Sequence, residues 1–252
     1  MVSKRRVIAR RVLTALVVMV VLAVGACAWY VNDYYHADEI ALSAIADEGG
    51  VDDGVEVREL PNGAIAFVPA EPKAGLVFYP GAKVQPEAYA PLMSRCAESG
   101  LICIIVKPLF NLAIIDMDAA TGATAQFPEI NRWVIAGHSM GGVAAADYLS
   151  RHEGEFDAIV FIASYPSVDL TGFQGKVLSI AGSVDRVLNR EQYASARKKL
   201  PSGAQELVIE GGNHANFGDY GKQSGDGEAT IAREDQQSRT AHAIASLFSL
   251  QV

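Results

Sequence analysis

Residues 132–146 read RWVIAGHSMGGVAAA, and this stretch decides the fold of the chain. An apolar run leads into Gly137-His138-Ser139-Met140-Gly141, and small residues suited to a tightly packed helix follow. A strand, a G-x-S-x-G turn and a helix in this order form a nucleophile elbow, which lifts the serine hydroxyl above the sheet. Side chains at Gly137 and Gly141 would collide with the strand and helix that cross there. The pattern predicts Ser139 as a nucleophile, with the Met140 N–H placed to stabilise an oxyanion.

Short runs rich in Val, Ile and Phe lie on both sides of this motif and alternate with helical patterns. Two of them flank the turn Pro61-Asn62-Gly63, which predicts a pair of adjacent strands. The last six runs are short and rich in Val, Ile and Phe, as in strands buried on both faces of a parallel sheet. The alternation predicts an α/β domain, a mostly parallel sheet with helices on both faces. Predicted strands cover 54–60, 64–70, 74–81, 101–108, 132–139, 158–166, 176–182 and 205–212, and predicted helices cover 33–48, 86–98, 112–124, 141–152, 189–199 and 229–249.

The functional residues of such sheets lie in loops after the carboxyl ends of the strands. Of the five histidines, His214 alone follows a late strand, so it is the candidate base for Ser139. His138, inside the elbow, is expected to pack beside the nucleophile instead. Asp185 follows the strand before that of His214 and is the candidate acid that orients the imidazole, and Asp169 is the alternative acid. The order serine, acid, histidine is the one that accompanies this motif.

The loop after the third predicted strand, residues 79–83, is expected to supply the second oxyanion donor, and by position the Ala82 N–H is the candidate. Only 46 positions separate Ser139 from Asp185, so no cap domain fits between them and the site should be open. The Gly-rich loop 217–227 receives no assignment. Aromatic and aliphatic side chains that could line an acyl pocket, or equally pack in the core, are Phe110, Leu112, Tyr165, Phe173 and Phe217.

A basic and then apolar N-terminal segment precedes this domain. Residues 1–11 carry five basic and no acidic residues, and residues 12–31 form an uncharged apolar run. Twenty such residues in a helix span about 30 Å, the thickness of a bilayer's hydrocarbon core, and the basic tip favours a cytoplasmic N-terminus. The sequence predicts a cytoplasmic tip at 1–11, a single-pass cell-membrane anchor at 12–31, a stalk or short helix at 32–50, and an extracytoplasmic domain at 51–252. A lipoprotein modified at Cys27 and a secreted protein with a cleaved signal peptide are the alternatives.

Composition narrows the classes of function. Beyond the basic tip the chain carries 29 acidic and 16 basic residues, so nucleic-acid binding is not expected, because phosphate recognition needs a basic surface. No His or Cys cluster has metal-ligand spacing, and serine chemistry needs no cofactor, so we expect neither a metal nor a cofactor. Cys96 and Cys103 are expected to be buried thiols, with a disulfide between them as the alternative. The residues carry no signal of oligomeric state.

Four segments together resemble the alpha/beta-hydrolase superfamily: the elbow GHSMGG, the acid in AGSVDRV, the histidine in GGNHANFG and the loop FYPGAKVQPEAY. They are most similar to small bacterial members of the alpha/beta hydrolase fold-5 family, which share the outline of dienelactone hydrolases. The resemblance covers about 51–252. It implies an alpha/beta-hydrolase fold, with Ser139, Asp185 and His214 as the triad and the backbones of Met140 and Ala82 as oxyanion donors. Dienelactone hydrolases carry Cys at the nucleophile and haloalkane dehalogenases carry Asp, so Ser139 disfavours both activities.

These features predict a membrane-tethered serine hydrolase, carboxylesterase-like, that cleaves an ester or related acyl bond of a small-molecule substrate through an acyl-enzyme. A thioesterase or amidase with the same triad is one alternative. A non-catalytic binding or scaffold protein that kept the fold is another. Activity is expected to fall below about pH 6–7, where a histidine base takes up a proton.

Overall fold

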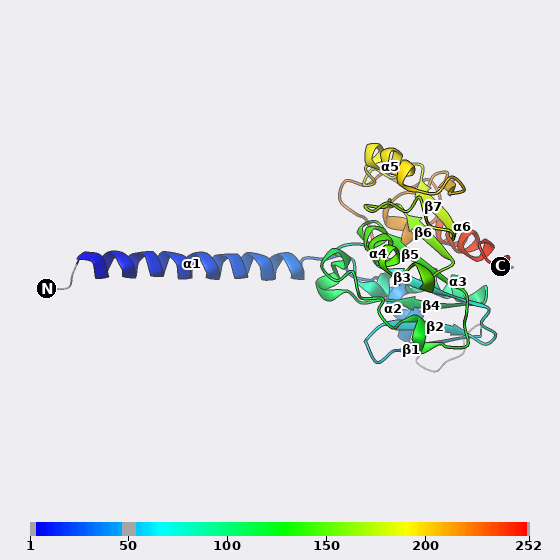
Figure 1. The fold of residues 1–252 in the computed structure, drawn as a ribbon, viewed down its shortest axis with the longest axis horizontal. Helices are drawn as coiled ribbons and strands as arrows, with labels where there is room; N and C mark the ends of the chain where they lie inside the picture. Colours follow the sequence, from blue (N-terminus) through cyan, green and yellow to red (C-terminus); the bar gives the residue numbers. More distant parts are fainter. Residues whose placement is uncertain (1–3, 47–53, 251–252) are drawn as a thin grey trace. The chain divides into compact units, whose positions relative to one another are not determined.

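The computed structural model describes residues 4–46 and 54–250, so the predictions for residues 1–3, 47–53 and 251–252 lie outside the described residues. The chain divides into two compact units, Met1–Tyr34 and Tyr35–Val252. The first contains α1 (Lys4–Asn32), one continuous helix (Figure 1). Its part Arg10–Asn32 is long and apolar enough to cross a membrane, and none of that stretch is buried. A signal sequence has the same character, so helix length and composition admit both an anchor and a signal.

The second unit is built around one sheet of eight strands in the order β1-β2-β4-β3-β5-β6-β7-β8. The pairs β1–β2 and β2–β4 are antiparallel, and all other neighbours are parallel, which confirms the predicted mostly parallel sheet. The strands are β1 (Val55–Glu59), β2 (Ile65–Pro69), β3 (Ala74–Tyr79), β4 (Leu101–Ile105), β5 (Trp133–His138), β6 (Ala158–Ile162), β7 (Lys176–Gly182) and β8 (Gln205–Ile209).

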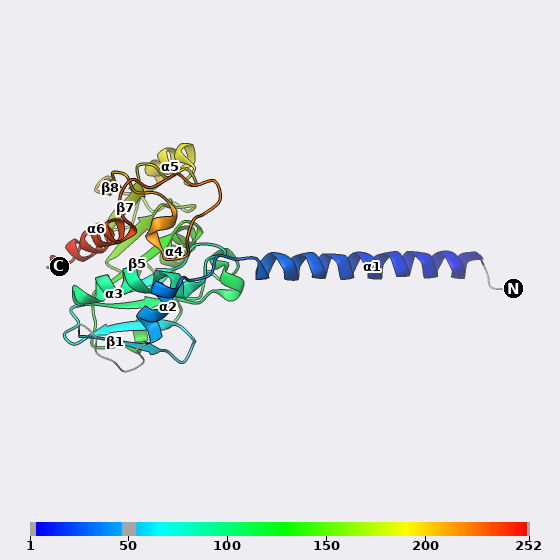
Figure 2. The same ribbon diagram turned by 180° about the vertical axis from the view of Figure 1, so that it is seen from behind.

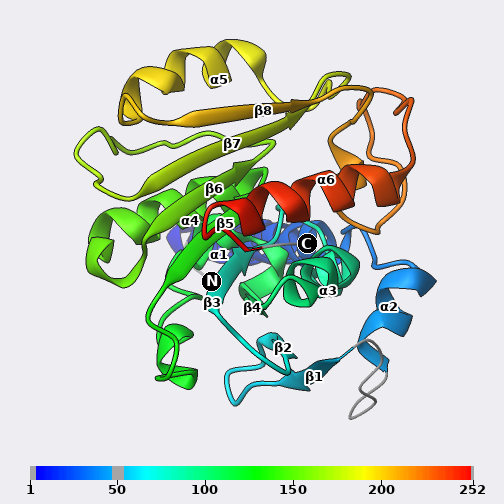
Figure 3. The same cartoon turned by 90° about the vertical axis from the view of Figure 1, so that its right-hand side faces the viewer.

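Two apolar layers cover the sheet because successive residues of a strand point to opposite faces. In β5, for example, Val134 and Ala136 belong to one core cluster and Ile135 to the other. Helices α2, α3 and α6 contribute to the first layer and α4 to the second, and Figure 3 shows α6 in front of the sheet. The α-helices are α2 (Glu39–Ala46), α3 (Ala90–Glu98), α4 (Met140–Arg151), α5 (Arg190–Ala196) and α6 (Arg233–Ser246), and the short 3₁₀ turns are η1 (Pro86–Tyr89), η2 (Leu109–Asn111), η3 (Ala113–Ile115), η4 (Thr124–Gln126), η5 (Glu153–Glu155), η6 (Arg197–Lys199) and η7 (Ala215–Phe217).

The segment 32–50, predicted as a stalk or short helix, contains the short helix α2, which packs in the folded unit. Helix α2 begins after Asp38, whose carboxylate accepts hydrogen bonds from the N–H groups of Ile40 and Ala41 at 3.1 Å. Ala41 is fully buried in the core, and α2 packs against α3 (Figure 2). The compact unit therefore starts at Tyr35, earlier than the expected boundary at residue 51.

A second difference lies between β4 and β5, where the apolar spacing predicted a helix over 112–124. The structure has the 3₁₀ turn η3 there, followed by a run of turns at 117–122 and the start of η4 at Thr124. Asp116 accepts a hydrogen bond from the Leu109 N–H at 2.9 Å, and Gly122 has a positive φ of 74°. Side chains that bond to nearby backbone compete with the helix, so the segment forms turns. Elsewhere the predicted helices are present, and Cys96 and Cys103 are buried free thiols.

The topology brings the functional loops to one edge of the sheet. The carboxyl ends of β3, β5, β6, β7 and β8 lie side by side, because these strands are parallel neighbours. Tyr79, the last residue of β3, is the register partner of Gly137 in β5. Among the described residues, no α-helix lies between β6 and β7, so nothing of the size of a cap domain covers this edge.

Candidate active site

The elbow has the steric form that its glycines require. A Cβ at Gly137 would lie 2.3 Å from the backbone carbon of Gly141, and one at Gly141 would lie 2.3 Å from the carbonyl oxygens of Tyr79 and Pro80. Ser139 has φ 52° and ψ −123°, a strained conformation for a residue with a side chain. The close crossing of β3, β5 and α4 therefore leaves room only for glycine and holds Ser139 in this conformation at the helix start.

The backbone of Ser139 is tied to the neighbouring strand on both sides. Its N–H donates to the carbonyl of Ile162 at 2.9 Å, and its own carbonyl accepts from the Ser164 hydroxyl at 2.6 Å. A Cβ at Gly142 would lie 2.4 Å from that hydroxyl oxygen. Ser164 does not stand out in the sequence. Its only signal is its place directly after β6, the strand that pairs with the elbow strand.

The candidate base and acid are in contact. Asp185 and His214 are both buried, and His214 Nδ1 donates to Asp185 Oδ2 at 2.9 Å. Burial of Asp185 raises the pKa of its carboxyl, but the bond from His214 and those from two backbone N–H groups outweigh burial, so the net pKa is lowered. The carboxylate thus stays ionised. Asp169, the alternative acid, lies in an exposed turn, where it accepts from the Thr171 N–H.

Because an ionised carboxylate only accepts, His214 carries its hydrogen on Nδ1 and its Nε2 has a free lone pair. Among the described residues, this buried Nε2 has no hydrogen-bond partner. Ser139 and His214 line the same small pocket, with a volume of about 130 Å³. A buried acceptor without a partner, in the pocket that holds a strained serine, is suited to take a proton from its hydroxyl.

The histidine inside the elbow has other partners. The ring of His138 packs on that of His214 with centroids 4.5 Å apart, and its Nδ1 lies 2.8 Å from the Tyr89 hydroxyl. That hydroxyl also accepts from the Gly81 N–H at 3.0 Å. Burial, followed by the nearby charge of His214, lowers the pKa of His138 well below its usual value. His138 is therefore neutral and lies beside the candidate base, where it connects that base to the loop after β3.

The two candidate oxyanion donors leave the sheet side by side, because β3 and β5 are paired up to Tyr79 and Gly137. Met140 is the first residue of α4, where a backbone N–H has no acceptor within the helix. Ala82 lies in a tight turn in which the Val84 N–H bonds to the Gly81 carbonyl at 3.3 Å. Met140 lines the pocket that holds Ser139, and the role of the two N–H groups as oxyanion donors stays a prediction.

The loop that carries His214 is held on both sides of the histidine. The Ala215 N–H donates to Asp226 at 2.9 Å. Asn213 pairs with the Gln236 side chain of α6 through its backbone N–H and carbonyl, at 3.0 and 2.8 Å. Neither Asp226 nor Gln236 stands out in the sequence, because an acid in a polar loop and a glutamine on a helix have many ordinary uses. Asp226 gives the unassigned Gly-rich loop a role as a support for His214.

Of the side chains proposed for an acyl pocket, the structure brings only Tyr165 to the pocket beside Ser139. Phe217 and Phe173 are buried in the core, whereas Phe110 is 58% exposed and Leu112 half-buried on a separate loop. The other lining residues follow β6 and β7 or begin α4, and no aromatic motif marks them. They are Met140, Val143, Ala163, Ser164, Val187, Leu188 and Asn189.

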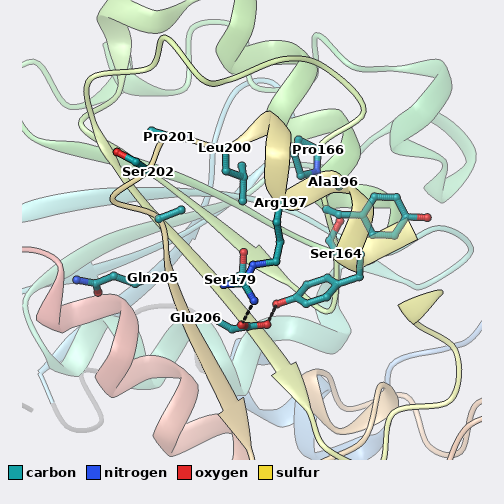
Figure 4. Close-up of a pocket in the computed structure, with 13 residues that line it drawn as sticks. Ser164, Pro166, Ser179, Ala196, Arg197, Leu200, Pro201, Ser202, Gln205 and Glu206 are labelled. Carbon is teal, nitrogen blue, oxygen red and sulfur yellow. Dashed lines mark hydrogen bonds and ion pairs between the residues drawn. The ribbon is translucent and has the colours of Figure 1, made fainter. Parts of the chain in front are cut away.

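A second hollow of about 170 Å³ adjoins the first, since Ser164 and Tyr165 line both (Figure 4). It lies over β7 and β8 beside α5, below the helix-free link from β6 to β7. Glu206 crosses its floor, where it accepts from Tyr193 at 2.8 Å and pairs with Arg197. Among residues 4–46 and 54–250 no group of three or more His, Cys, Asp or Glu side chains is placed to hold a metal ion.

Comparison with known proteins places this arrangement in a family. A model described as "Alpha/beta hydrolase family" matches residues 75–238, which contain Ser139, Asp185 and His214. No curated protein matches the chain in sequence.

Solved structures share the fold at low sequence identity. A dienelactone hydrolase from Anabaena variabilis is 14% identical, with a TM-score of 0.57 over 79% of this chain and 100% of its own. Est1E from Butyrivibrio proteoclasticus is 13% identical, with a TM-score of 0.52 over 78% of this chain and 99% of its own. A bacterial membrane phospholipase A is 13% identical, with a TM-score of 0.58 over 95% of this chain and 98% of its own. At these identities the likeness shows the fold alone.

Proposed function

Because the chain belongs to the alpha/beta hydrolase family, we propose that it is a serine hydrolase that cleaves an ester or a related acyl bond. Ser139 is the nucleophile, His214 the base and Asp185 the acid that orients the base. The observation that carries the proposal is the 2.9 Å bond between Asp185 and His214, whose unpartnered Nε2 belongs to the same pocket as the strained Ser139. A binding protein with this fold would have no use for that combination.

The reaction follows from these positions. The Ser139 hydroxyl attacks the carbonyl carbon, and its proton passes to His214 Nε2. The negative charge that forms on the substrate oxygen is held by the N–H groups of Met140 and Ala82. When the bond to the leaving alcohol breaks, that alcohol takes the proton from Nε2. Water then attacks the acyl carbon and gives a proton to Nε2. The bond from that carbon to Ser139 Oγ breaks, Oγ takes the proton from Nε2, and the acid is released.

Electrostatics support the same division of roles. The ionised Asp185 stabilises the imidazolium that forms on His214 in each half-reaction and keeps the Nδ1 tautomer in place. His138 is neutral and packs against that ring, so it adds no opposing positive charge. The pocket walls formed by Val143, Val187 and Leu188 are apolar, which favours the acyl group over a charged moiety.

Anchoring is the second part of the proposal. Helix α1 holds the enzyme in the cell membrane, with residues 1–11 in the cytoplasm and the hydrolase unit outside, because five basic residues precede an apolar stretch long enough to span a bilayer. A thioester or amide substrate uses the same residues. A lipid ester is also compatible with the fold, since one structural neighbour is described as a membrane phospholipase A.

The proposal is tested by labelling the detergent-solubilised full chain with a fluorophosphonate, beside Ser139→Ala and Ser164→Ala variants. Such probes react with activated serines only. Labelling of the wild type and Ser164→Ala, with none of Ser139→Ala, would support an activated Ser139. A folded wild-type chain that stays unlabelled would favour the binding-protein alternative, and labelling of Ser139→Ala would place the nucleophile elsewhere.

A further inference from the structure

A loop after β4 presents an unusual run of exposed apolar side chains. Residues 109–115 read LFNLAII. Leu109 is 61% exposed, Phe110 and Ile115 are each 58% exposed, and Ile114 is 38% exposed. Among the described residues outside α1, eight large apolar side chains are exposed, and four of them belong to this loop. An apolar cluster of this kind on a protein surface marks a site of contact with a partner.

The loop is held in an outward-facing conformation. Phe110 and Asn111 both have φ 56°, a backbone conformation that is unfavourable for residues other than glycine and persists only where the surroundings enforce it. The Asn111 carbonyl accepts from the Lys83 N–H at 2.7 Å. Ala113 is buried, and η3 packs against α4. The loop thus anchors one small residue in the core and directs its large apolar residues outward.

The same contacts connect the loop through Lys83 to Tyr35, the first residue of the folded unit. Lys83 follows Ala82, the candidate oxyanion donor. Its N–H bonds to the apolar loop, and its carbonyl accepts from the Tyr35 N–H at 2.7 Å. Tyr35 comes three residues after Asn32, the last residue of α1, and three Cα–Cα steps reach at most about 11 Å. Hydrogen bonds and a short stretch of backbone thus tie the loop to the point where the chain leaves α1.

We infer that residues 109–115 contact the lipid of the membrane that holds α1, and that the substrate class is an acyl ester resident in that bilayer. The inference rests on the proposed function. Leu, Phe and Ile are side chains that interfacial segments bury about 5–10 Å into the boundary between headgroups and acyl chains. We favour lipid as the occupant because the link of three residues after α1 connects this surface to the membrane helix. No comparable link connects it to a second copy of the chain.

The lipid contact is tested with tryptophan as a depth probe. The full chain carries Trp29→Phe and either Leu109→Trp or, as the control, Val208→Trp on the edge strand β8, where Val208 is 49% exposed. Trp133 is buried and gives the same background in both. Each protein is reconstituted in phosphatidylcholine vesicles with or without bromine on the acyl chains.

We expect bromine to quench at least half of the Leu109→Trp emission and to leave the Val208→Trp emission unchanged. Equal emission from Leu109→Trp in both kinds of vesicle would overturn the inference. Emission that changes with the protein-to-lipid ratio but not with bromine would assign the surface to a second copy of the chain instead.

The substrate class is tested separately with Leu109→Ser/Ile115→Ser, a double variant that leaves the site residues unchanged, and Val208→Ser as its control. For phosphatidylcholine in vesicles we expect kcat/KM of the double variant to fall on the order of tenfold, because truncation removes the apolar area that binds lipid. For a water-soluble butyrate ester we expect no change. The inference would be overturned if kcat/KM of the double variant fell equally on both substrates, or if it fell on neither substrate.

A wild type that turns over neither ester and takes no fluorophosphonate label would refute the proposed function. The quenching experiment would still decide the lipid contact.

Discussion

The elbow at residues 137–142 and the loop at 210–232 that carries His214 reach the same pocket by different physical means. The elbow is fixed by sterics within a few residues, since Gly137 and Gly141 have no room for a Cβ. The histidine loop is fixed by polar contacts with distant segments, among them Asp226 and Gln236. A local steric constraint leaves a motif in the sequence, whereas a set of long-range hydrogen bonds does not.

The largest effect is expected at the contact between His214, in the histidine loop, and Asp185, which follows β7. Asp185→Asn removes the negative charge that fixes the Nδ1–H tautomer, so kcat should fall about 10⁴-fold. Steady-state turnover of a soluble ester measures this. Asp169→Asn, in an exposed turn, is the matched control and should retain the wild-type rate. A similar loss of kcat in both variants would mean that Asp185 has no specific role in catalysis.

On the elbow side, Gly141→Ala should disable the site through sterics alone. The new Cβ would lie 2.3 Å from two carbonyl oxygens, and backbone cannot yield as a flexible side chain does. Displacement of Ser139 by about 1 Å is enough for a loss on the order of 10²-fold in kcat, with destabilisation of about 1–3 kcal/mol. Gly154→Ala has open space around its Cβ and should change neither the rate nor the melting temperature. Wild-type activity of Gly141→Ala would contradict the steric account.

On the histidine-loop side, Asp226→Ala should lower kcat by roughly 10- to 100-fold with KM nearly unchanged, because the support at Ala215 is lost and the His214 ring is misplaced. Glu228→Ala, in the same loop, breaks only an exposed ion pair with Lys222 and should have little effect. Steady-state kinetics of the two variants on one ester show whether the loss comes from the missing hydrogen bond between Asp226 and Ala215 or from a general loosening of the loop. Equal losses would favour the general effect.

The smallest expected effect concerns pH and His138. Burial and the neighbouring His214 hold the pKa of His138 well below its usual value, so the unfolded chain binds a proton that the folded chain does not. The free energy of unfolding should therefore be highest above about pH 6.5 and fall as pH decreases, with a slope of up to about 1.4 kcal/mol per pH unit.

Denaturant titrations of the detergent-solubilised chain between pH 7 and pH 5 measure this slope. His138→Asn keeps an acceptor for the Tyr89 hydroxyl and should show a shallower dependence on pH. His242→Asn, at an exposed position on α6, should behave like the wild type. An unchanged slope in His138→Asn would assign the acid sensitivity to other groups.

Much of the fold was predictable because its signals are local. Strands β2 to β7 were runs rich in apolar residues, and burial on both faces explains that pattern. The edge strands β1 and β8 are partly exposed and contain charged residues. The prediction of a helix over 112–124 was wrong. The hydrogen bond of Asp116 to the backbone favours turns there, and the apolar spacing is too weak to favour a helix. Residues 35–46, predicted as part of a stalk or short helix, belong to the folded unit, which the packing of Ala41 reveals.

By itself, the sequence determined the alternation of strands and helices, the elbow, and the order in which Ser139, Asp185 and His214 follow their strands. These depend on residue spacing, side-chain size and backbone sterics over a few positions. The tertiary structure decided that Asp185 rather than Asp169 contacts His214, that Ser164 and Asp226 support the site, and that Phe217 packs in the core. Those contacts join residues far apart in the chain, so they exist only once the sheet has brought the loops together, and no short segment encodes them.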